Sequence, residues 1–373
     1  MLPNELLDAI IEECRNDRQT LMACSLANRA LRWSSQKRLF AEITLSGSHC
    51  YATHAAPYPS LLRLVSSSSQ IASYVKSLRI HDSDKEIIPQ ILEQLPNIES
   101  LSIAWTSPDF IGNALTRALS RSQFQNISFD GMMFKTSEEF FELFARSTEI
   151  RSVQFSDSCI ETILPSSMAP FQRCTILDLS LRTGEGETNQ FVDGVLGISS
   201  TINVGHLRRL QFWMTTTAYL PALLKLLATT KGILEELELH LLALAATPRQ
   251  GELDVSGIPR VKCVLRCSVY SRPILACVAC IFGGTSSATL EEVELVLRVS
   301  DSKPFDASDD ILWNDADSVM VRAKKRVSIC IEFLRPEQRD RYGDACVGLF
   351  LRKMDGCRGK GTLHVDSKVV APY

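Results

Sequence analysis

Two cysteines, Cys277 and Cys280, have the spacing that most directly suggests chemistry, because a CxxC pair can bind a metal ion or exchange a disulfide. A zinc site needs four ligands, and the nearest second pair, Cys263 and Cys267, is expected on one face of a single strand. None of the six histidines stands at zinc-finger spacing. Apolar residues surround Cys277 and Cys280, so the sequence favours a buried helix over a zinc or redox site.

The glycine-rich segment 356–362, GCRGKGT, invites comparison with a phosphate-binding loop. A Walker motif has four residues between its first glycine and the Gly-Lys pair, and a Ser or Thr directly after the lysine. Here two residues intervene and Gly361 follows the lysine. We therefore expect a glycine turn that precedes a final strand.

Two charged segments near the C-terminus could also bind ligands. The stretch from Asp301 to Asp317 contains six aspartates but lacks the glycine and terminal glutamate of a calcium loop. It is interpreted as a solvated loop, with a substrate-binding insertion as the alternative. The basic cluster from Arg322 to Arg326 fits a charged helix face, and a nuclear import signal or an anion-binding patch is its alternative.

No arrangement of Ser, His and Asp, of Cys and His, or of paired carboxylates can be identified from spacing. We therefore expect no catalytic, cofactor-binding or metal-binding residues, and a protein that is not an enzyme. The net charge is only −3, so no global charge attracts nucleic acid or an anionic membrane. This balance favours a protein partner over either.

The composition is that of a globular protein, with 45% hydrophobic and 22% charged residues. The chain has 373 residues, enough for two domains or for one repeat array. Its twelve cysteines are scattered, which favours free thiols in the cytosol or nucleus. The longest uncharged apolar run, 273–282, is too short to cross a bilayer, and acidic residues interrupt the first helix where a signal peptide would be apolar.

The first helix is predicted within MLPNELLDAIIEE, where Leu6, Leu7, Ile10 and Ile11 recur at helical spacing and acidic residues take the other face. Such a stripe has to be buried somewhere. Leu7 and Ile11 are expected to close a small bundle. Leu2, Pro3, Leu6 and Ile10 are then left for a partner.

Two more helices are predicted in the first 45 residues. One covers residues 20–31, with Thr20 as its N-cap, and a shorter one covers residues 34–40. This region is basic where the first helix is acidic, so the two charge sets should offset each other. We divide the chain into a helical domain at 1–45, a connecting helical segment at 46–74 and a repeat region at 75–373.

The repeat region contains a short strand pattern, apolar-x-x-apolar-x-apolar, about every 28 residues. Helix-like stretches such as 86–96, 138–147 and 220–230 lie between the strands. A chain with this period buries its apolar faces by stacking neighbours into a parallel sheet with helices on the other side. The central positions of the strand patterns are Leu78, Leu101, Ile127, Val153, Leu177, Leu210, Leu237, Val261, Val293, Ile329 and Leu363.

The N-terminal segment resembles the F-box, and its CSLxxR…LF wording is similar to the F-box proteins of mushroom-forming fungi. One departure is that Leu31 stands where the family often has Trp, and Trp33 is displaced by two residues. The resemblance covers about 45 residues and is carried by Leu2, Pro3, Glu5, Leu6, Leu7, Ile10, Leu21, Cys24, Ser25, Leu26, Arg29, Leu39 and Phe40.

The remainder resembles the leucine-rich repeats that follow many F-boxes. The expected fold class is therefore α/β: a three-helix unit followed by a solenoid with parallel strands on its concave face and helices on its convex face. The family has Asn at the ninth repeat position, where it bonds successive turns of backbone. Here Ser, Thr or Arg stands there, which predicts an irregular solenoid. These positions are Ser83, Thr106, Ser158, Thr215, Arg266 and Arg298.

The resemblance implies a substrate-recognition subunit of a cullin-based ubiquitin ligase. Its N-terminal helices would dock on a Skp-type adaptor, itself bound to a cullin, and its repeats would bind an unknown protein target. The alternatives are a repeat scaffold or ligand-binding protein whose helices only cap the first repeat, and a cysteine-dependent enzyme. The residues implied for adaptor docking are Leu2, Pro3, Leu6, Ile10, Leu21 and Leu26.

Overall fold

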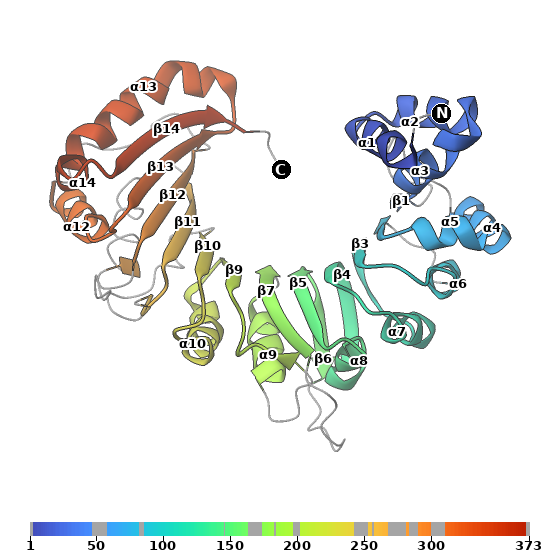
Figure 1. Ribbon diagram of the computed structural model, residues 1–373. Helices are drawn as coiled ribbons and strands as arrows, with labels where there is room; N and C mark the ends of the chain where they lie inside the picture. The colour runs from blue at the N-terminus through green and yellow to red at the C-terminus, as the bar shows by residue number, and fades with distance from the viewer. Residues whose placement is uncertain are drawn as a thin grey trace. The chain divides into compact units, whose positions relative to one another are not determined.

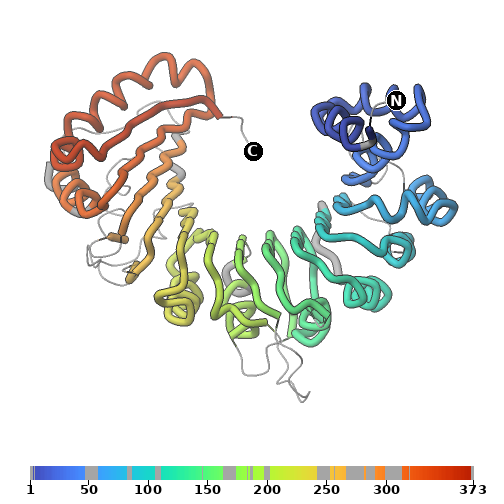
Figure 2. The backbone as a smooth tube through the Cα atoms, in the orientation of Figure 1, coloured from blue at the N-terminus to red at the C-terminus, as the bar shows by residue number. Residues whose placement is uncertain are grey.

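The computed structural model divides the chain into two compact units, Met1–Cys174 with Ile198–Ile202, and Thr175–Gly197 with Asn203–Tyr373. Figures 1 and 2 show the course of the backbone. The residues that the structure describes are 3–46, 58–81, 86–144, 146–162, 174–182, 184–196, 202–241, 253–255, 257–267, 281–282, 290–299 and 310–370.

The first unit begins with three helices, α1 (Asn4–Glu13), α2 (Arg18–Ala27) and α3 (Arg29–Leu39). The predicted N-cap of the second helix is wrong, because Asp17 caps α2 and its carboxylate accepts the backbone N–H of Thr20 at 3.0 Å. The predicted helix boundary is also wrong. Asn28 is extended, ends α2 and caps α3 by accepting the N–H of Ala30, so α3 begins well before residue 34.

Strands and helices then alternate through the first unit. Neighbouring strands β1 to β5 pair in parallel in chain order, and β6 pairs in parallel with β4. The elements are β1 (Glu42–Ser46), α4 (Tyr58–Ser67), α5 (Ser69–Tyr74), β2 (Ser77–His81), α6 (Ile87–Glu93), β3 (Ser100–Phe110), α7 (Asn113–Ser120), β4 (Asn126–Thr136), α8 (Ser137–Glu142), β5 (Glu149–Ser156) and β6 (Cys159–Thr162).

The second unit repeats this arrangement, with parallel pairing from β7 through β9 to β14 in chain order. Its elements are β7 (Cys174–Arg182), α9 (Glu185–Leu196), β8 (Ile202–Asn203), β9 (Arg209–Met214), η1 (Thr217–Tyr219), α10 (Leu220–Thr229), β10 (Glu236–Leu241), β11 (Arg260–Cys267), β12 (Glu292–Val299), α12 (Asp310–Met320), β13 (Arg326–Phe333), α13 (Pro336–Lys353), α14 (Asp355–Gly359) and β14 (Leu363–Val369).

The predicted α/β fold, with helices followed by parallel strands that alternate with helices as in leucine-rich repeats, is confirmed. Every predicted strand position lies on a strand, but two are out of register. Leu179, not Leu177, aligns with Leu210, and Val327, not Ile329, aligns with Val293. The pattern at these two strands has an extra apolar residue, so the periodicity alone does not fix the phase.

A repeated backbone contact joins the starts of neighbouring strands. The carbonyl of Ala41 accepts the N–H groups of Lys76 and Ser77, both at 2.9 Å. In the second unit the carbonyl of Arg208 accepts the N–H groups of Glu235 and Glu236 at 2.8 and 3.0 Å. The contact uses only main-chain atoms, so it is compatible with many sequences.

Ser158 occupies one of the positions where Asn was expected to be replaced by a hydroxyl residue. Its buried hydroxyl donates to the carbonyl of Ser156 at 2.9 Å and accepts the N–H of Met132 at 3.1 Å. It therefore joins β4 to the turn after β5. Ser83 and the side chains of Thr106 and Arg266 lie outside the described residues.

Three predictions near the C-terminus are corrected or refined. Residues 310–320 form helix α12, with Trp313 fully buried, so this part of the acidic stretch is not a loop; residues 301–309 lie outside the described part. The basic cluster 322–326 is a turn that leads into β13, not a helix. A glycine turn at Gly361, with φ of +70°, does precede β14, but 355–359 form a short helix before it.

Helix length and hydropathy rule out a membrane span for every helix in the described ranges. The eight cysteines whose side chains are described have free thiols, and Cys174, Cys263, Cys346 and Cys357 are buried. Cys277 and Cys280 lie outside the described residues.

Gly131 in β4 has a backbone conformation and a close neighbour that a larger residue would not fit, and this can be tested in the first unit. Its φ is +69°, and an added Cβ would lie 2.4 Å from the carbonyl oxygen of Trp105. Gly131→Ala should therefore lower the free energy of unfolding by at least about 2 kcal/mol in a urea titration. Gly112→Ala is the matched control in the same unit, since nothing lies within 4 Å of its added Cβ. Equal loss in both variants would contradict this assignment.

Candidate functional site

Helix α1 turns a partly charged face towards α3. The hydroxyl of Ser34 donates to the carboxylate of Asp8, and Glu12 forms ion pairs with Arg38 of α3 and, at 3.4 Å, with Arg15. Ile11, on the same side, is 1% exposed. The predicted offset between the acidic first helix and the basic segment after it is confirmed for Glu12.

The opposite side of α1 is apolar and exposed. Leu6 and Ile10, one turn apart, point about 180° away from Asp8 and Glu12 at 100° per residue. Leu6 is 51% exposed and Ile10 is 49% exposed. Pro3 is exposed as well. Of the two residues expected to close the bundle, Ile11 is buried and Leu7 is half-buried, and Pro3, Leu6 and Ile10 are exposed; contact of these three residues with a partner stays a prediction.

Helix α2 is divided in the same way. Leu21 and Ser25 are buried, whereas Met22 and Leu26 are 51% and 80% exposed. Leu21 therefore packs inside the bundle and is not part of an exposed face, which corrects its inclusion among the predicted docking residues. Met22 was not predicted, although its place one turn before Leu26 is visible in the sequence. Leu2 lies outside the described residues.

We call the exposed apolar residues of α1 and α2 the N-terminal face: Pro3, Leu6, Ile10, Met22 and Leu26. A soluble protein commonly exposes single apolar side chains, but exposed pairs one turn apart on two consecutive helices favour contact with a partner. Apart from the single thioether of Met22, the face contains no group that could donate a proton or bind a metal. Its chemistry is that of hydrophobic association.

The contacts of Trp33 account for part of the departure from the F-box pattern, in which Leu31 stands where the family often has Trp. Its ring lies 5.9 Å from that of Tyr74 on α5, edge to face at 67°, so it joins the helical bundle to the first repeat helices. Leu31 is half-buried. The displaced tryptophan thus makes an internal contact while keeping 61% of its surface exposed.

A second candidate surface is the face of the second unit's sheet that bears polar side chains. Its first row alternates in charge across adjacent strands in register. Arg209 pairs with Asp178 at 3.1 Å, and Arg260 pairs with Glu236 at 3.6 Å. The row comprises Asp178, Arg209, Glu236, Arg260, Glu292 and Arg326.

The neighbouring positions on this face form a network around His240. Its Nε2 lies 2.9 Å from Glu238 Oε1 and 3.1 Å from the side-chain nitrogen of Gln211, and its ring stacks on Trp213 with centroids 4.0 Å apart. Burial opposes ionisation of Glu238, but contacts with His240 and with Lys262, at 3.3 Å, keep its pKa below the ordinary value. Glu238 therefore remains a carboxylate that contacts both His240 and Lys262.

Glu332 is the most deeply buried carboxylate on this face, at 6% exposed. Arg298 donates to it at 2.7 Å from β12, and Lys368 pairs with it at 3.2 Å from β14. Burial opposes its ionisation, but these two cations lower the pKa of Glu332. The carboxylate thus ties three adjacent strands together.

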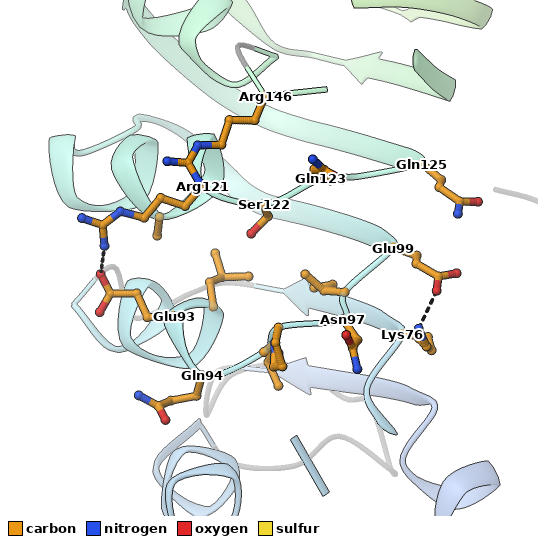
Figure 3. A pocket seen from close by; sticks show the side chains of 15 residues that line it. Lys76, Glu93, Gln94, Asn97, Glu99, Arg121, Ser122, Gln123, Gln125 and Arg146 are labelled. Atoms are coloured by element: carbon orange, nitrogen blue, oxygen red, sulfur yellow. Dashed lines mark hydrogen bonds and ion pairs between the residues drawn. The ribbon is translucent and has the colours of Figure 1, made fainter. Parts of the chain in front are cut away.

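The first unit also contains a cleft of about 770 Å³ between helix ends and strand starts (Figure 3). Two ion pairs lie on its wall, Lys76 with Glu99 at 2.6 Å and Arg121 with Glu93 at 3.0 Å. Four side-chain amides, the hydroxyl of Ser122 and the guanidinium of Arg146 complete the labelled lining. The charges on Lys76 and Arg121 are already partly neutralised, so the cleft does not form a strong anion site.

The described residues give little support to thiol or metal chemistry. Burial raises the pKa of Cys174 to about 12 and that of Cys346 to about 11, so both remain thiols at neutral pH. Within the described ranges, no cluster of three His, Cys, Asp or Glu side chains is placed to hold a metal ion. Cys277 and Cys280 are not among these residues.

Comparison of the chain with protein-family models and with curated proteins gives no match in either case. The function is therefore inferred from the resemblance of the N-terminal segment to the F-box and from the geometry of the N-terminal face and the polar sheet face.

Glu332 yields a prediction for the second unit. Glu332→Ala removes the carboxylate that Arg298 bonds in a buried setting, and it should lower the free energy of unfolding by about 3 kcal/mol in urea. Since its pKa is lowered in the folded state, its contribution is present above about pH 4.3 and is lost as the pH falls through the folded value. The difference between wild type and variant should shrink accordingly in acid.

Glu291→Ala is the matched control, because Glu291 pairs with Lys325 at a similar distance, 2.7 Å, but on the exposed surface. Water screens such a pair, so this variant should lose far less stability. A loss as large as that of Glu332→Ala would contradict the special role of the buried carboxylate.

Proposed function

We propose that this protein is a substrate-recognition subunit of a Skp-cullin-F-box ubiquitin ligase. Its N-terminal face would bind a Skp-type adaptor, and through it a cullin, while the repeats bind a protein target. The observation that carries this proposal is the orientation of α1, whose charged side faces α3 while Leu6 and Ile10 face outwards.

That orientation argues against helices that only cap the first repeat. A capping helix buries its apolar residues and exposes its charged ones, whereas α1 exposes two large apolar side chains and turns Asp8 and Glu12 towards α3, where both carboxylates keep contact with solvent. Burial of one such side chain in a complex contributes roughly 1.5 to 3 kcal/mol. Together, Leu6, Ile10, Met22 and Leu26 can offset association costs of several kcal/mol.

The target surface is proposed to be the polar sheet face of the repeats. Its charged rows supply partners for a protein surface of complementary charge, and Trp213 adds an aromatic contact. The described residues offer no constellation that performs bond chemistry. The contribution to ubiquitin transfer would be proximity, since holding the target near a charged ubiquitin carrier raises its effective concentration.

The proposal predicts a specific effect of charge on the N-terminal face. Leu6→Asp with Ile10→Asp should abolish co-purification of a Skp-type adaptor, because each change removes apolar burial and adds a desolvation cost. The expected loss of affinity is at least about a hundredfold. The measurement is affinity purification from cells that contain the adaptor, followed by titration of the purified proteins.

The control is Ile233→Asp, which introduces the same charge at an apolar residue that is 44% exposed in the second unit. It should leave adaptor binding unchanged. Circular dichroism of all variants checks that the bundle remains folded. If the intact chain brings down no Skp-type adaptor, the ligase proposal is wrong.

The second candidate function is a repeat scaffold or ligand-binding protein that has no ubiquitin link. The charged sheet face favours it equally, because that face can bind a protein whether or not α1 engages an adaptor. The same purification separates the two, since a scaffold retains its target and yields no adaptor.

A further inference from the structure

Among the strands that the structure describes, β14, the last strand of the second unit, has one unpaired edge. It pairs with β13 alone among the strands of the described ranges and stands at the end of the strand order (Figures 1 and 2). Its side chains that face α13 are also less buried than those of β13. Val327, Ile329 and Ile331 of β13 are fully buried, whereas Leu363 and Val365 are half-buried and Val369 is 41% exposed.

The backbone groups at this edge can be assigned from two hydrogen bonds. The carbonyl of Thr362 accepts the N–H of Val327, and the N–H of Val370 donates to Phe333, so even-numbered residues of β14 face β13. The N–H and C=O of one residue point to the same edge, and the edges alternate along a strand. The groups of Leu363, Val365, Ser367 and Val369 therefore face the open edge.

Asp366 protects part of this edge. Its carboxylate accepts the N–H of Ser367 at 2.7 Å, which satisfies a donor that would otherwise be available to another strand. A charged group that covers an edge donor is a common way to limit unwanted strand pairing. The protection is selective, because a cation brought opposite Asp366 would attract the carboxylate and release the donor.

We infer that the open edge of β14 binds one extended segment of a partner protein, which adds in parallel as the next strand. The charge pattern of the sheet defines that segment. Charges alternate across strands, as in Arg298, Glu332 and Lys368, so the incoming residue opposite Lys368 is acidic. The residue opposite Asp366 is a lysine or arginine, and the residues between are apolar or small.

A second copy of the chain fits this edge poorly. Antiparallel pairing of β14 with itself over its full length would place Asp366 opposite Asp366 and His364 opposite Lys368. Like charges directly opposite each other destabilise a sheet. The occupant is therefore a segment of a different protein, and this inference does not depend on adaptor binding.

The test uses the full chain and two fluorescent peptides of alternating valine and threonine, each as long as β14. One carries lysine opposite Asp366 and glutamate opposite Lys368, and the other has these two residues exchanged. Fluorescence anisotropy should show the matched peptide binding about fivefold more tightly. Equal binding of the two, tighter binding of the exchanged peptide, or no binding of either would overturn the inference.

Two variants locate the binding at β14. Val365→Pro removes an N–H that faces the open edge and none that bonds β13, so the strand should persist while the matched peptide binds at least tenfold more weakly. Asp366→Lys should abolish the preference between the peptides, because each peptide then makes one attractive and one repulsive pair with the lysines at 366 and 368. Unchanged affinity in a folded Val365→Pro variant, an unchanged preference in Asp366→Lys, or self-association of the chain that Val365→Pro removes would each overturn the inference.

Discussion

The structure depends on a parallel backbone contact that is repeated at the start of several strands in each unit. One carbonyl accepts two N–H groups from the next strand, as Ala41 does for Lys76 and Ser77, and Arg208 does for Glu235 and Glu236. This contact fixes the register of each strand to its neighbour without any side chain. Apolar residues can then alternate into the core, and the backbone register does not restrict the residue types on the other face of the sheet.

That freedom explains why polar and charged side chains are concentrated on one face of the sheet in the second unit. The aligned strands bring residues far apart in sequence into rows, so that Asp178 meets Arg209 and Glu332 meets both Arg298 and Lys368. A buried carboxylate such as Glu332 is held ionised only because two cations from neighbouring strands surround it. The same register makes the open edge of β14 selective.

The sequence predicted the alternation of strands and helices because each repeat has to bury one apolar face. It could not fix the phase at β7 and β13, where Leu177 and Ile329 are apolar but misaligned with their neighbours. It also missed the break at Asn28, because the apolar spacing runs through that residue while the hydrogen bond to Ala30 ends one helix and starts the next. The rows of paired charges depend on the register between strands that are far apart in sequence, so no local sequence pattern predicts them.

The candidate docking residues could also be predicted only in part from the sequence. Leu6 and Ile10 share a face in the sequence, but only the contacts of Asp8 and Glu12 with α3 determine that this face points outwards. Leu21 has the same helical spacing and is buried. Periodicity thus identifies faces, and the packing of the neighbouring helix decides which face a partner can reach.

The central claim is that α1 and α2 bind a Skp-type adaptor while the repeats remain available for a target. Amide hydrogen exchange on the intact chain, measured with and without the purified adaptor, tests it most directly. Adaptor binding should slow amide exchange in residues 4–27 and leave exchange in β9 to β13 unchanged. A complex that leaves exchange in α1 and α2 unchanged, or the absence of any complex, would contradict it.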